Sequence, residues 1–432
     1  MPLCNSVSTV LEETGGMEIS VNMNINEKYN VINDYDNNDV IKLRLIKEFE
    51  KVYGDSAGVC VFFAPGRVNL IGEHTDYNGG CVFPCAITLG TYIVMRKSES
   101  SMTRYYSMNF EHMGVIEGRI SNIKYFKSSG WANYPKSIVW ALQKKNVIIG
   151  SGFDMLVYGN LPNGSGLSSS ASLEAVTLYA LIKLYNIRMD KIEMARLCQF
   201  AENEFIGMNC GIMDQFAIIM GRKDNVIYLD TGKLKYKYVP VRLKDVRIVI
   251  ASSNKKRKLG ESKYNERRSE CERAYGFLKE EAAKDGLEVS SLCELDMEQF
   301  DKYSYVLKDD ILYRRAKHAI SENERTKRAV NAFIHDDVEQ FGHLMNESHI
   351  SLRDDYEVTG YELDTLVNAA WECDGVIGSR MTGAGFGGCT VSIVREDCIS
   401  SFIKNVGEKY NAKTHLNADF YVVDISDGVC AL

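Results

Sequence analysis

The sequence lacks the features of several classes of protein. No apolar run approaches the roughly 20 residues that a membrane-spanning helix needs. Residues 1–20 contain acidic side chains and no basic one, which excludes an ordinary secretory signal. The chain also lacks a basic face of the kind that a general nucleic-acid binder needs, because 51 basic and 58 acidic side chains give a net charge of −7. We therefore expect a cytoplasmic protein with no membrane and no nucleic acid as partner. A monomer is expected, since no heptad seam marks an interface.

Paired-cysteine motifs are missing as well. The 12 cysteines are scattered, mostly among apolar neighbours, and none forms a Cys-x-x-Cys pair. The seven histidines show no metal-ligand spacing. This pattern favours reduced, buried thiols over a disulfide framework.

The 432 residues suffice for two or three domains. Residues 1–37 are polar and rich in Asn and Asp, which indicates a poorly ordered leader. Helical and strand-like segments then interleave, and several strands are hairpin-like, which favours an α+β fold over a doubly wound parallel sheet. The expected helices are 40–52, 133–144, 173–184, 190–205, 212–220, 261–283, 324–346, 361–371 and 398–410. The expected strands are 58–64, 81–87, 90–96, 225–229, 235–239, 246–252, 375–379, 390–394 and 420–424, with a turn at residues 65–66.

The run LPNGSGLSSSAS at residues 161–172 is the most informative segment. Its glycines allow a close backbone approach to a ligand, and small hydroxyl residues at a helix start leave N–H groups open to an anion. A Walker A loop would place a Lys after the glycines, and none is present. The run predicts a phosphate seat of another kind, for a nucleoside triphosphate. Helix N-capping by the serines is the simpler alternative.

A second group of polar residues lies within residues 65–80. Arg67, Glu73, His74 and Asp76 fall within ten positions of one another in a glycine-bounded segment. Such side chains offer both donors and acceptors, which a polyhydroxylated ligand requires. The alternative is a solvated surface turn.

Two acidic residues are candidates for chemistry on a phosphate. Glu202, together with the Ser170 hydroxyl, could bind Mg²⁺, which takes one or two carboxylates plus phosphate oxygens and water. Asp214 lies in an apolar segment, where burial is costly without a partner, and Arg67 is a candidate for that partner. The same Arg could stabilise charge on a transferring phosphoryl group. Alternatively, Asp214 is a helix N-terminal acid favoured by the helix dipole.

The run MTGAGFGGC at residues 381–389 satisfies Gly-x-Gly-x-x-Gly. A dinucleotide fingerprint must open a helix, whereas this run leads into a strand-like segment. It is expected to support the nucleotide or the substrate, with a purely structural turn as the alternative.

These motifs, in this order, resemble those of the GHMP kinases. The segment GRVNLIGEHTDYN at residues 66–78 is similar to the signature of the galactokinase family within them. CGIMDQF at 210–216 and SLRDDYEV at 351–358 extend the resemblance, which covers the chain from about residue 40 to its end. It implies a two-lobed GHMP kinase fold with mixed sheets and the active site between the lobes. The N-terminal lobe would span residues 38–240 and the C-terminal lobe residues 241–432, with the 1–37 leader outside both.

The resemblance also implies an activity: transfer of the γ-phosphoryl group of MgATP to the C1 hydroxyl of α-D-galactose, giving α-D-galactose 1-phosphate and ADP in galactose catabolism. The implied catalytic residues are Asp214 and Arg67. The implied sugar-binding residues are Glu73, His74, Asp76, Gly211, Asp214 and Tyr264. The implied ATP-binding residues are Gly164, Ser165, Gly166, Leu167, Ser168, Ser169 and Ser170, and Mg²⁺ would be held by Ser170 and Glu202.

Three questions stay open at this level. Asp214 either accepts the hydroxyl proton or mainly orients the hydroxyl. A kinase for a related sugar such as N-acetylgalactosamine is one alternative, although the residues at 73–78 favour galactose. A non-catalytic sensor of galactose and ATP on the same fold is another, although the intact loop at 166–171 favours an enzyme.

Overall fold

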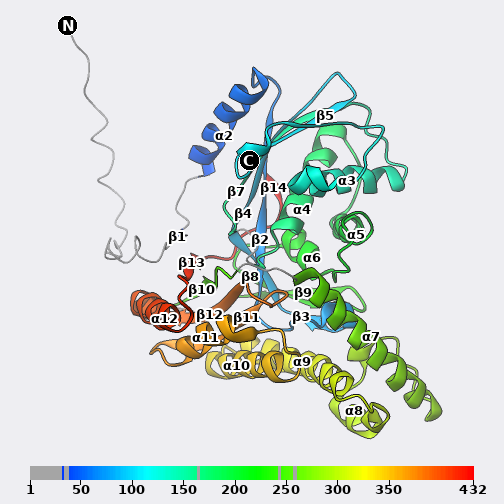
Figure 1. Ribbon diagram of the computed structural model, residues 1–432, viewed down its shortest axis with the longest axis vertical. Helices are drawn as coiled ribbons and strands as arrows, with labels where there is room; N and C mark the ends of the chain where they lie inside the picture. The colour runs from blue at the N-terminus through cyan, green and yellow to red at the C-terminus, as the bar shows by residue number, and fades with distance from the viewer. Residues whose placement is uncertain (1–31, 34–37, 163–165, 242–244, 256–259) are drawn as a thin grey trace.

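The computed structural model describes residues 32–33, 38–162, 166–241, 245–255 and 260–432 (Figure 1). Three sheets organise this part of the chain. The largest contains, in spatial order, β14 (Cys430–Ala431), β2 (Cys60–Asn69), β4 (Pro84–Lys97), β7 (Phe153–Gly159), β5 (Met102–Ser107) and β6 (Ile116–Arg119). The pair β5–β7 is parallel and the others are antiparallel, so the sheet is mixed.

Helices cover both faces of this sheet. Figure 1 shows α2 (Asn38–Tyr53) on one side, and the opposite side carries α3 (Asn133–Lys144), α4 (Ser169–Tyr185), α5 (Lys191–Ala201) and α6 (Met213–Met220). The residues of β2 alternate accordingly, because successive side chains on a strand point to opposite faces. Phe62 and Ala64 join the core under α3–α6, and Phe63 joins the core under α2.

A second sheet lies in the lower half of Figure 1. Its strands, in spatial order, are β1 (Ile32–Asn33), β13 (Asp419–Val423), β10 (Val246–Ser252), β12 (Cys389–Arg395) and β11 (Val376–Thr382). The helices of this half are α7 (Gly260–Lys284), α8 (Met297–Tyr303), α9 (Asp310–Ile334), α10 (Val338–Asp354), α11 (Gly360–Trp371) and α12 (Ile399–Thr414). A small third sheet contains β3 (Cys81–Val82), β8 (Asn225–Asp230) and β9 (Lys235–Pro240).

The N-terminal and C-terminal halves of the chain share a buried core, and one loop of each half touches the other. Val68 and Phe83 from the first half pack in one apolar cluster with Phe341 and Val391 from the second. A Cβ atom at Gly383, in the loop between β11 and β12, would lie 2.7 Å from the carbonyl oxygen of Gly166. This glycine loop therefore touches Gly166 of the run at residues 161–172, which we call the serine-rich loop. The contact brings the two halves together at the site.

Several expected elements differ from the structure. No turn occurs at residues 65–66; β2 continues through Pro65 and Gly66 and absorbs a register shift there. The expected strands 81–87 and 90–96 are the short β3 followed by one long strand, β4. The expected helix 324–346 is two helices, because Asp336 has a left-handed φ of 56° and Asp337 caps the start of α10. Periodicity alone misses this break, since both helices are amphipathic.

The helix expected at 190–205 also ends early. Its α-helical part, α5, stops at Ala201 and is followed by a π-helical turn at Glu202–Ile206. π-helical turns are rare and are frequent at functional sites. Here the turn carries Glu202.

Most of the leader at residues 1–37 lies outside the described residues, but Ile32–Asn33 pairs in parallel with β13. The expected lobe boundary at residues 240–241 falls in the connection between β9 and β10 and stays a prediction. The chain end returns to the first sheet, where β14 pairs with β2. All cysteines of the described part are free thiols, as the sequence suggests. Within the same residues, no helix is long and apolar enough to cross a membrane.

Candidate active site

Arg67 and Asp214 form an ion pair at the centre of the candidate site. Arg67 Nε and Nη2 each lie 2.7 Å from Asp214 Oδ1, and Arg67 Nη1 donates to the Gly166 carbonyl at 2.7 Å. The Arg67 side chain is 4% exposed, whereas that of Asp214 is 29% exposed. The pair that the sequence suggests is therefore formed, with the guanidinium buried and the carboxylate partly exposed to solvent.

The described part of the serine-rich loop contacts this pair. Gly164 and Ser165 lie outside the described residues, whereas Gly166 and Leu167 contact Arg67 through their carbonyl oxygens. Ser168 has a left-handed φ of 60°, and its hydroxyl donates to Asp214 Oδ2 at 2.5 Å. Because this hydroxyl does not cap α4, simple N-capping does not explain Ser168. Ser169 and Ser170 form the first turn of α4, whose free N–H groups favour an anion.

Glu202 and Ser170 lie side by side next to this centre. Glu202 is 3% exposed, and its Oε2 accepts a hydrogen bond from Gln215 Nε2 at 2.7 Å. Burial, and then the Asp214 charge, raise the pKa of Glu202 to about 7, while a hydrogen bond from Ser170 acts in the opposite direction. The described residues contain no group of three or more His, Cys, Asp or Glu side chains that could hold a metal by themselves. A hard cation at this pair would need further oxygens from a ligand, as Mg²⁺ bound to a nucleotide has.

Asp76 lies near Asp214 and contacts the start of α6. It lies in a 3₁₀ turn, Asp76–Asn78, and its Oδ2 accepts a weak hydrogen bond from the Met213 N–H at 3.4 Å. Burial and the nearby Asp214 raise the pKa of Asp76 to about 7. Gly211 packs its backbone against this carboxylate.

His74 comes from the N-terminal half of the chain and is buried against aromatic rings of the C-terminal half. Its ring centroid lies 5.7 Å from that of Tyr264 on α7 and 4.9 Å from that of Tyr356. Burial, followed by the neighbouring His318, Arg267 and Arg380, lowers the pKa of His74 to about 3, so the imidazole is neutral at ordinary pH. Burial also raises the pKa of Tyr264 well above its ordinary value.

Glu73 precedes His74, and both oxygens of its carboxylate accept hydrogen bonds from other residues of the protein. Its Oε1 accepts from the Gly383 N–H at 2.7 Å and from Thr382 Oγ1 at 3.0 Å, and it lies 3.4 Å from Arg380 Nη2. Its Oε2 accepts from Asn69 Nδ2 at 3.0 Å. Glu73 thus ties the loop after β2 to the glycine loop, and it is 1% exposed.

Sequence reasoning missed several of these partners. The sequence motifs do not predict three contacts: that of Ser168 with Asp214, that of Glu73 with Arg380 and Thr382, and that of Gln215 with Glu202. Thr382 stands inside the glycine motif, and Gln215 follows Asp214 directly, so proximity to a motif was the available signal.

Models of known families match three parts of the chain. The galactokinase galactose-binding signature matches residues 47–97. The GHMP kinase N-terminal domain matches residues 133–222, and the GHMP kinase C-terminal model matches residues 329–412. These ranges contain the Arg67, Asp214 and glycine-loop motifs, respectively.

Individual relatives are similar over nearly their whole length. A galactokinase of Fusobacterium nucleatum is 56% identical over 384 residues, which cover 89% of this chain and 98% of that protein. A galactokinase of Clostridium beijerinckii is 52% identical, with coverage of 89% and 97%.

Solved structures agree with these relatives. The Lactococcus lactis galactokinase, crystallised with galactose, superposes with a TM-score of 0.87 at 45% identity and covers 91% of this chain and 100% of its own. The mevalonate kinase of Methanococcus jannaschii, at 21% identity and a TM-score of 0.60, shares the fold. The α+β GHMP kinase fold expected from the sequence is thereby confirmed. With relatives this similar over nearly their full length, the chain belongs to the galactokinase family of the GHMP kinases.

Proposed function

We propose that this chain transfers the γ-phosphoryl group of MgATP to the C1 hydroxyl of α-D-galactose, giving α-D-galactose 1-phosphate and ADP. Family membership supports an ATP-dependent sugar kinase, and the Lactococcus lactis relative was crystallised with galactose. The observation that carries the proposal is the Arg67–Asp214 pair, in which Arg67 contacts Gly166 of the serine-rich loop and Asp214 lies near Asp76. A phosphate on one side and a sugar hydroxyl on the other would meet at this pair.

Asp214 and Arg67 are the proposed catalytic residues. Both oxygens of Asp214 already accept hydrogen bonds, Oδ1 from Arg67 and Oδ2 from Ser168. This engagement favours orientation of the C1 hydroxyl over early removal of its proton. As the bond from O1 to the γ-phosphorus forms and the bond from that phosphorus to the ADP oxygen breaks, the hydroxyl proton passes to Asp214. Such an order suits the loose transition state of phosphoryl transfer, in which positioning and charge stabilisation dominate.

The proposal also assigns the residues that bind ATP, Mg²⁺ and the sugar. The ATP-phosphate loop would comprise Gly164, Ser165, Gly166, Leu167, Ser168, Ser169 and Ser170. Ser170 and Glu202 would hold Mg²⁺, since the hydroxyl and the carboxylate lie together beside this loop. The bound ion would neutralise charge on the phosphate oxygens. The sugar-binding residues would be Glu73, His74, Asp76, Gly211, Asp214 and Tyr264, with Glu73 acting from its position against the glycine loop.

A substrate panel tests the proposal. Purified full-length chain with MgATP is given galactose, N-acetylgalactosamine, arabinose and glucose, and ADP release is followed by a coupled assay. We expect turnover with galactose, and phosphorus NMR of the product should show a phosphate on C1. Turnover with N-acetylgalactosamine in preference to galactose would favour the related-sugar kinase. Galactose and ATP binding without ADP release would favour the sensor.

We also propose that the protein is a cytoplasmic monomer. The proposal rests on the sequence features described above. Light scattering coupled to size-exclusion chromatography should give the mass of one 48.7 kDa chain. A mass of twice that value would contradict the monomer.

A further inference from the structure

A line of hydroxyl and thiol groups leads away from His74 into the protein. The Tyr77 hydroxyl lies 2.8 Å from His74 Nδ1 and 2.8 Å from the Tyr356 hydroxyl, which in turn lies 3.1 Å from Cys271 Sγ. Tyr356 and Cys271 are fully buried. The four groups come from the loop after β2, from α7 and from the connection between α10 and α11, so only the folded chain assembles them.

The acid–base chemistry of these groups decides which of them donates and which accepts in each hydrogen bond of the line. A phenol has one proton, so Tyr77 donates either to His74 or to Tyr356, and not to both. Phenol is a good donor, and a neutral imidazole nitrogen accepts better than a phenol oxygen, because imidazole is by far the stronger base. The favoured order therefore runs from the Cys271 thiol to Tyr356, from Tyr356 to Tyr77, and from Tyr77 to His74 Nδ1. In the reverse order the line would end on sulfur, which is a weak acceptor.

The other nitrogen of the ring is left for a ligand. His74 Nε2 is buried and makes no hydrogen bond of good geometry with the residues that the structure describes, although the backbone of Ala384 lies close enough to act on the ring. The ring is neutral, so it carries one proton, and an acceptor role at Nδ1 places that proton on Nε2. Nε2 is then a donor, suited to an acceptor oxygen of a sugar hydroxyl.

We infer that Tyr77 and Tyr356 are positioning residues that hold His74 in the tautomer with its proton on Nε2, and thereby fix how the sugar site recognises a hydroxyl group. The inference rests on the proposed function for the identity of the ligand. A site with a fixed donor rejects a ligand that offers no acceptor there, because the buried N–H would stay unpaired.

The backbone conformation of His74 is consistent with a ring held in one fixed position. His74 has a left-handed φ of 62°, which is uncommon outside glycine, and the Asn78 side chain donates to its carbonyl oxygen at 2.8 Å. Strained residues persist where the surrounding structure holds them, and they cluster at ligand sites. With the backbone and the ring fixed by these contacts, the tautomer is the remaining variable.

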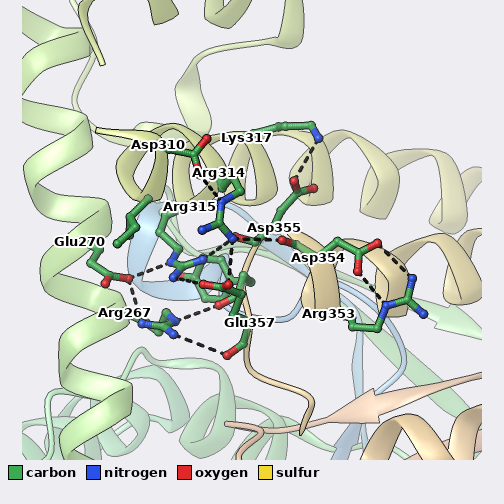
Figure 2. Close-up of polar contacts among 12 residues, drawn as sticks. Arg267, Glu270, Asp310, Arg314, Arg315, Lys317, Arg353, Asp354, Asp355 and Glu357 are labelled. Atoms are coloured by element: carbon green, nitrogen blue, oxygen red, sulfur yellow. Dashed lines mark hydrogen bonds and ion pairs between the residues drawn. The ribbon is translucent and has the colours of Figure 1, made fainter. Parts of the chain in front are cut away.

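The backbone around Tyr356 accepts hydrogen bonds from a network of ion pairs that includes Arg267, Glu270 and Arg315, which Figure 2 shows. Arg267 Nε donates to the Tyr356 carbonyl at 2.8 Å, and Arg315 Nη1 donates to the Asp355 carbonyl at 2.6 Å. Glu270 binds both arginines, at 3.0 Å from Arg267 and 2.8 Å from Arg315. Arg315 is 1% exposed and also forms an ion pair with Glu357, the residue after Tyr356. These contacts clamp the backbone on both sides of Tyr356, so its hydroxyl meets Tyr77 at a fixed place.

Steady-state kinetics of conservative variants provide the first test. Tyr77→Phe removes the partner of Nδ1, and we expect the KM for galactose to rise about tenfold, with kcat and the KM for ATP within about twofold of wild type. Tyr356→Phe breaks the line one step further away and should have a smaller effect of the same kind. Tyr410→Phe is the control, because it removes a buried hydroxyl that donates to the Ser253 carbonyl at 2.7 Å and contacts none of the four groups of the line. An unchanged KM for galactose in Tyr77→Phe, or an equal change in both KM values, would overturn the inference.

Nitrogen NMR of ¹⁵N-histidine-labelled protein provides the second test and needs no turnover. The His74 signals, assigned by their loss in His74→Gln, should show the proton on Nε2 in the wild type and a mixture of tautomers in Tyr77→Phe. A wild-type proton on Nδ1 would overturn the inference even if galactose is phosphorylated. Failure of the wild type to phosphorylate galactose, with the proton found on Nε2, would instead contradict the proposed function and leave the assigned tautomer standing.

Discussion

Asp76 lies directly over Gly211: a Cβ atom at position 211 would be 1.8 Å from Asp76 Oδ2. No real Cβ approaches an oxygen that closely, so any side chain at position 211 must displace the carboxylate. The contact explains why a glycine stands between the Glu202 turn and Asp214. It also links a position that contributes only backbone to the placement of a proposed sugar-binding residue.

Gly211→Ala should therefore impair catalysis by moving Asp76. We expect kcat/KM for galactose to fall roughly 10- to 100-fold, with the larger part in KM, because a displaced carboxylate loses its bond to the sugar. Gly276→Ala on α7 is the matched control, since a Cβ there meets nothing within 4 Å. Its activity should equal that of the wild type. Full activity in Gly211→Ala would show that Asp76 does not need its present position.

Asp214→Asn tests the charge of the central carboxylate at nearly constant shape. We expect kcat to fall roughly a thousandfold while the protein still folds, because the amide neither takes the hydroxyl proton nor pairs with Arg67. Asp214→Ala should abolish turnover in a folded protein. Asp190→Asn is the control, because Asp190 caps α5 through a 2.8 Å bond from the Glu193 N–H, and Asn caps a helix equally well. Asp214→Asn with activity within tenfold of wild type would refute the assignment.

The raised pKa of Glu202 predicts a pH-dependent stability and a pH-dependent effect of Mg²⁺. The pKa is about 7 in the folded state against an ordinary 4.5, so the folded protein binds this proton more tightly than the unfolded chain. The resulting stabilisation is fully present below pH 4.5 and is lost as the pH rises through 7. Glu202→Gln should remove this part of the pH dependence and raise the Tm at pH 8 by roughly 2–5 °C.

The same variant should lose its response to Mg²⁺. In the wild type with ATP present, Mg²⁺ should raise the Tm more at pH 8 than at pH 6, because the ion needs the ionised carboxylate. The exposed Glu298→Gln on α8 serves as control and should behave like the wild type. An equal Mg²⁺ shift in Glu202→Gln and wild type would exclude Glu202 as a ligand.

Replacing Glu73 should strongly lower the stability of the folded protein. Glu73→Gln leaves the buried Arg380, which is 0% exposed, without its carboxylate, and urea unfolding should show a loss of about 3 kcal/mol. The exposed pair of Lys409 and Glu372, at the shorter distance of 2.8 Å, gives the comparison. Glu372→Gln should leave stability unchanged, because solvent screens an exposed ion pair. Adding Arg380→Met to Glu73→Gln should recover part of the loss, and the absence of any recovery would mean that the ion pair is not its cause.

Much of the site could be predicted because its residues stand in motifs that are local in sequence. The charge of Asp214 in an apolar segment required a partner, and Arg67 was identified although 147 positions separate the two. The limits of α3 and β10 agree with the expectation to the residue, since an amphipathic helix and a buried strand have clear periodicities. The break between α9 and α10 was missed, because apolar positions at helical spacing continue on both sides of it.

The sequence by itself determined the chemistry: which side chains are acidic, which loop can receive a phosphate, and the family to which the chain belongs. Only the tertiary structure decided what each of these groups contacts. It turned the Ser168 hydroxyl toward Asp214, placed Glu202 in a π-helical turn, bound Glu73 to the glycine loop, and joined His74 to Tyr356. Local patterns record whether a side chain is apolar, charged or small. They do not record which of hundreds of distant atoms will satisfy a buried donor or acceptor, because that choice is made when the two halves of the chain pack together.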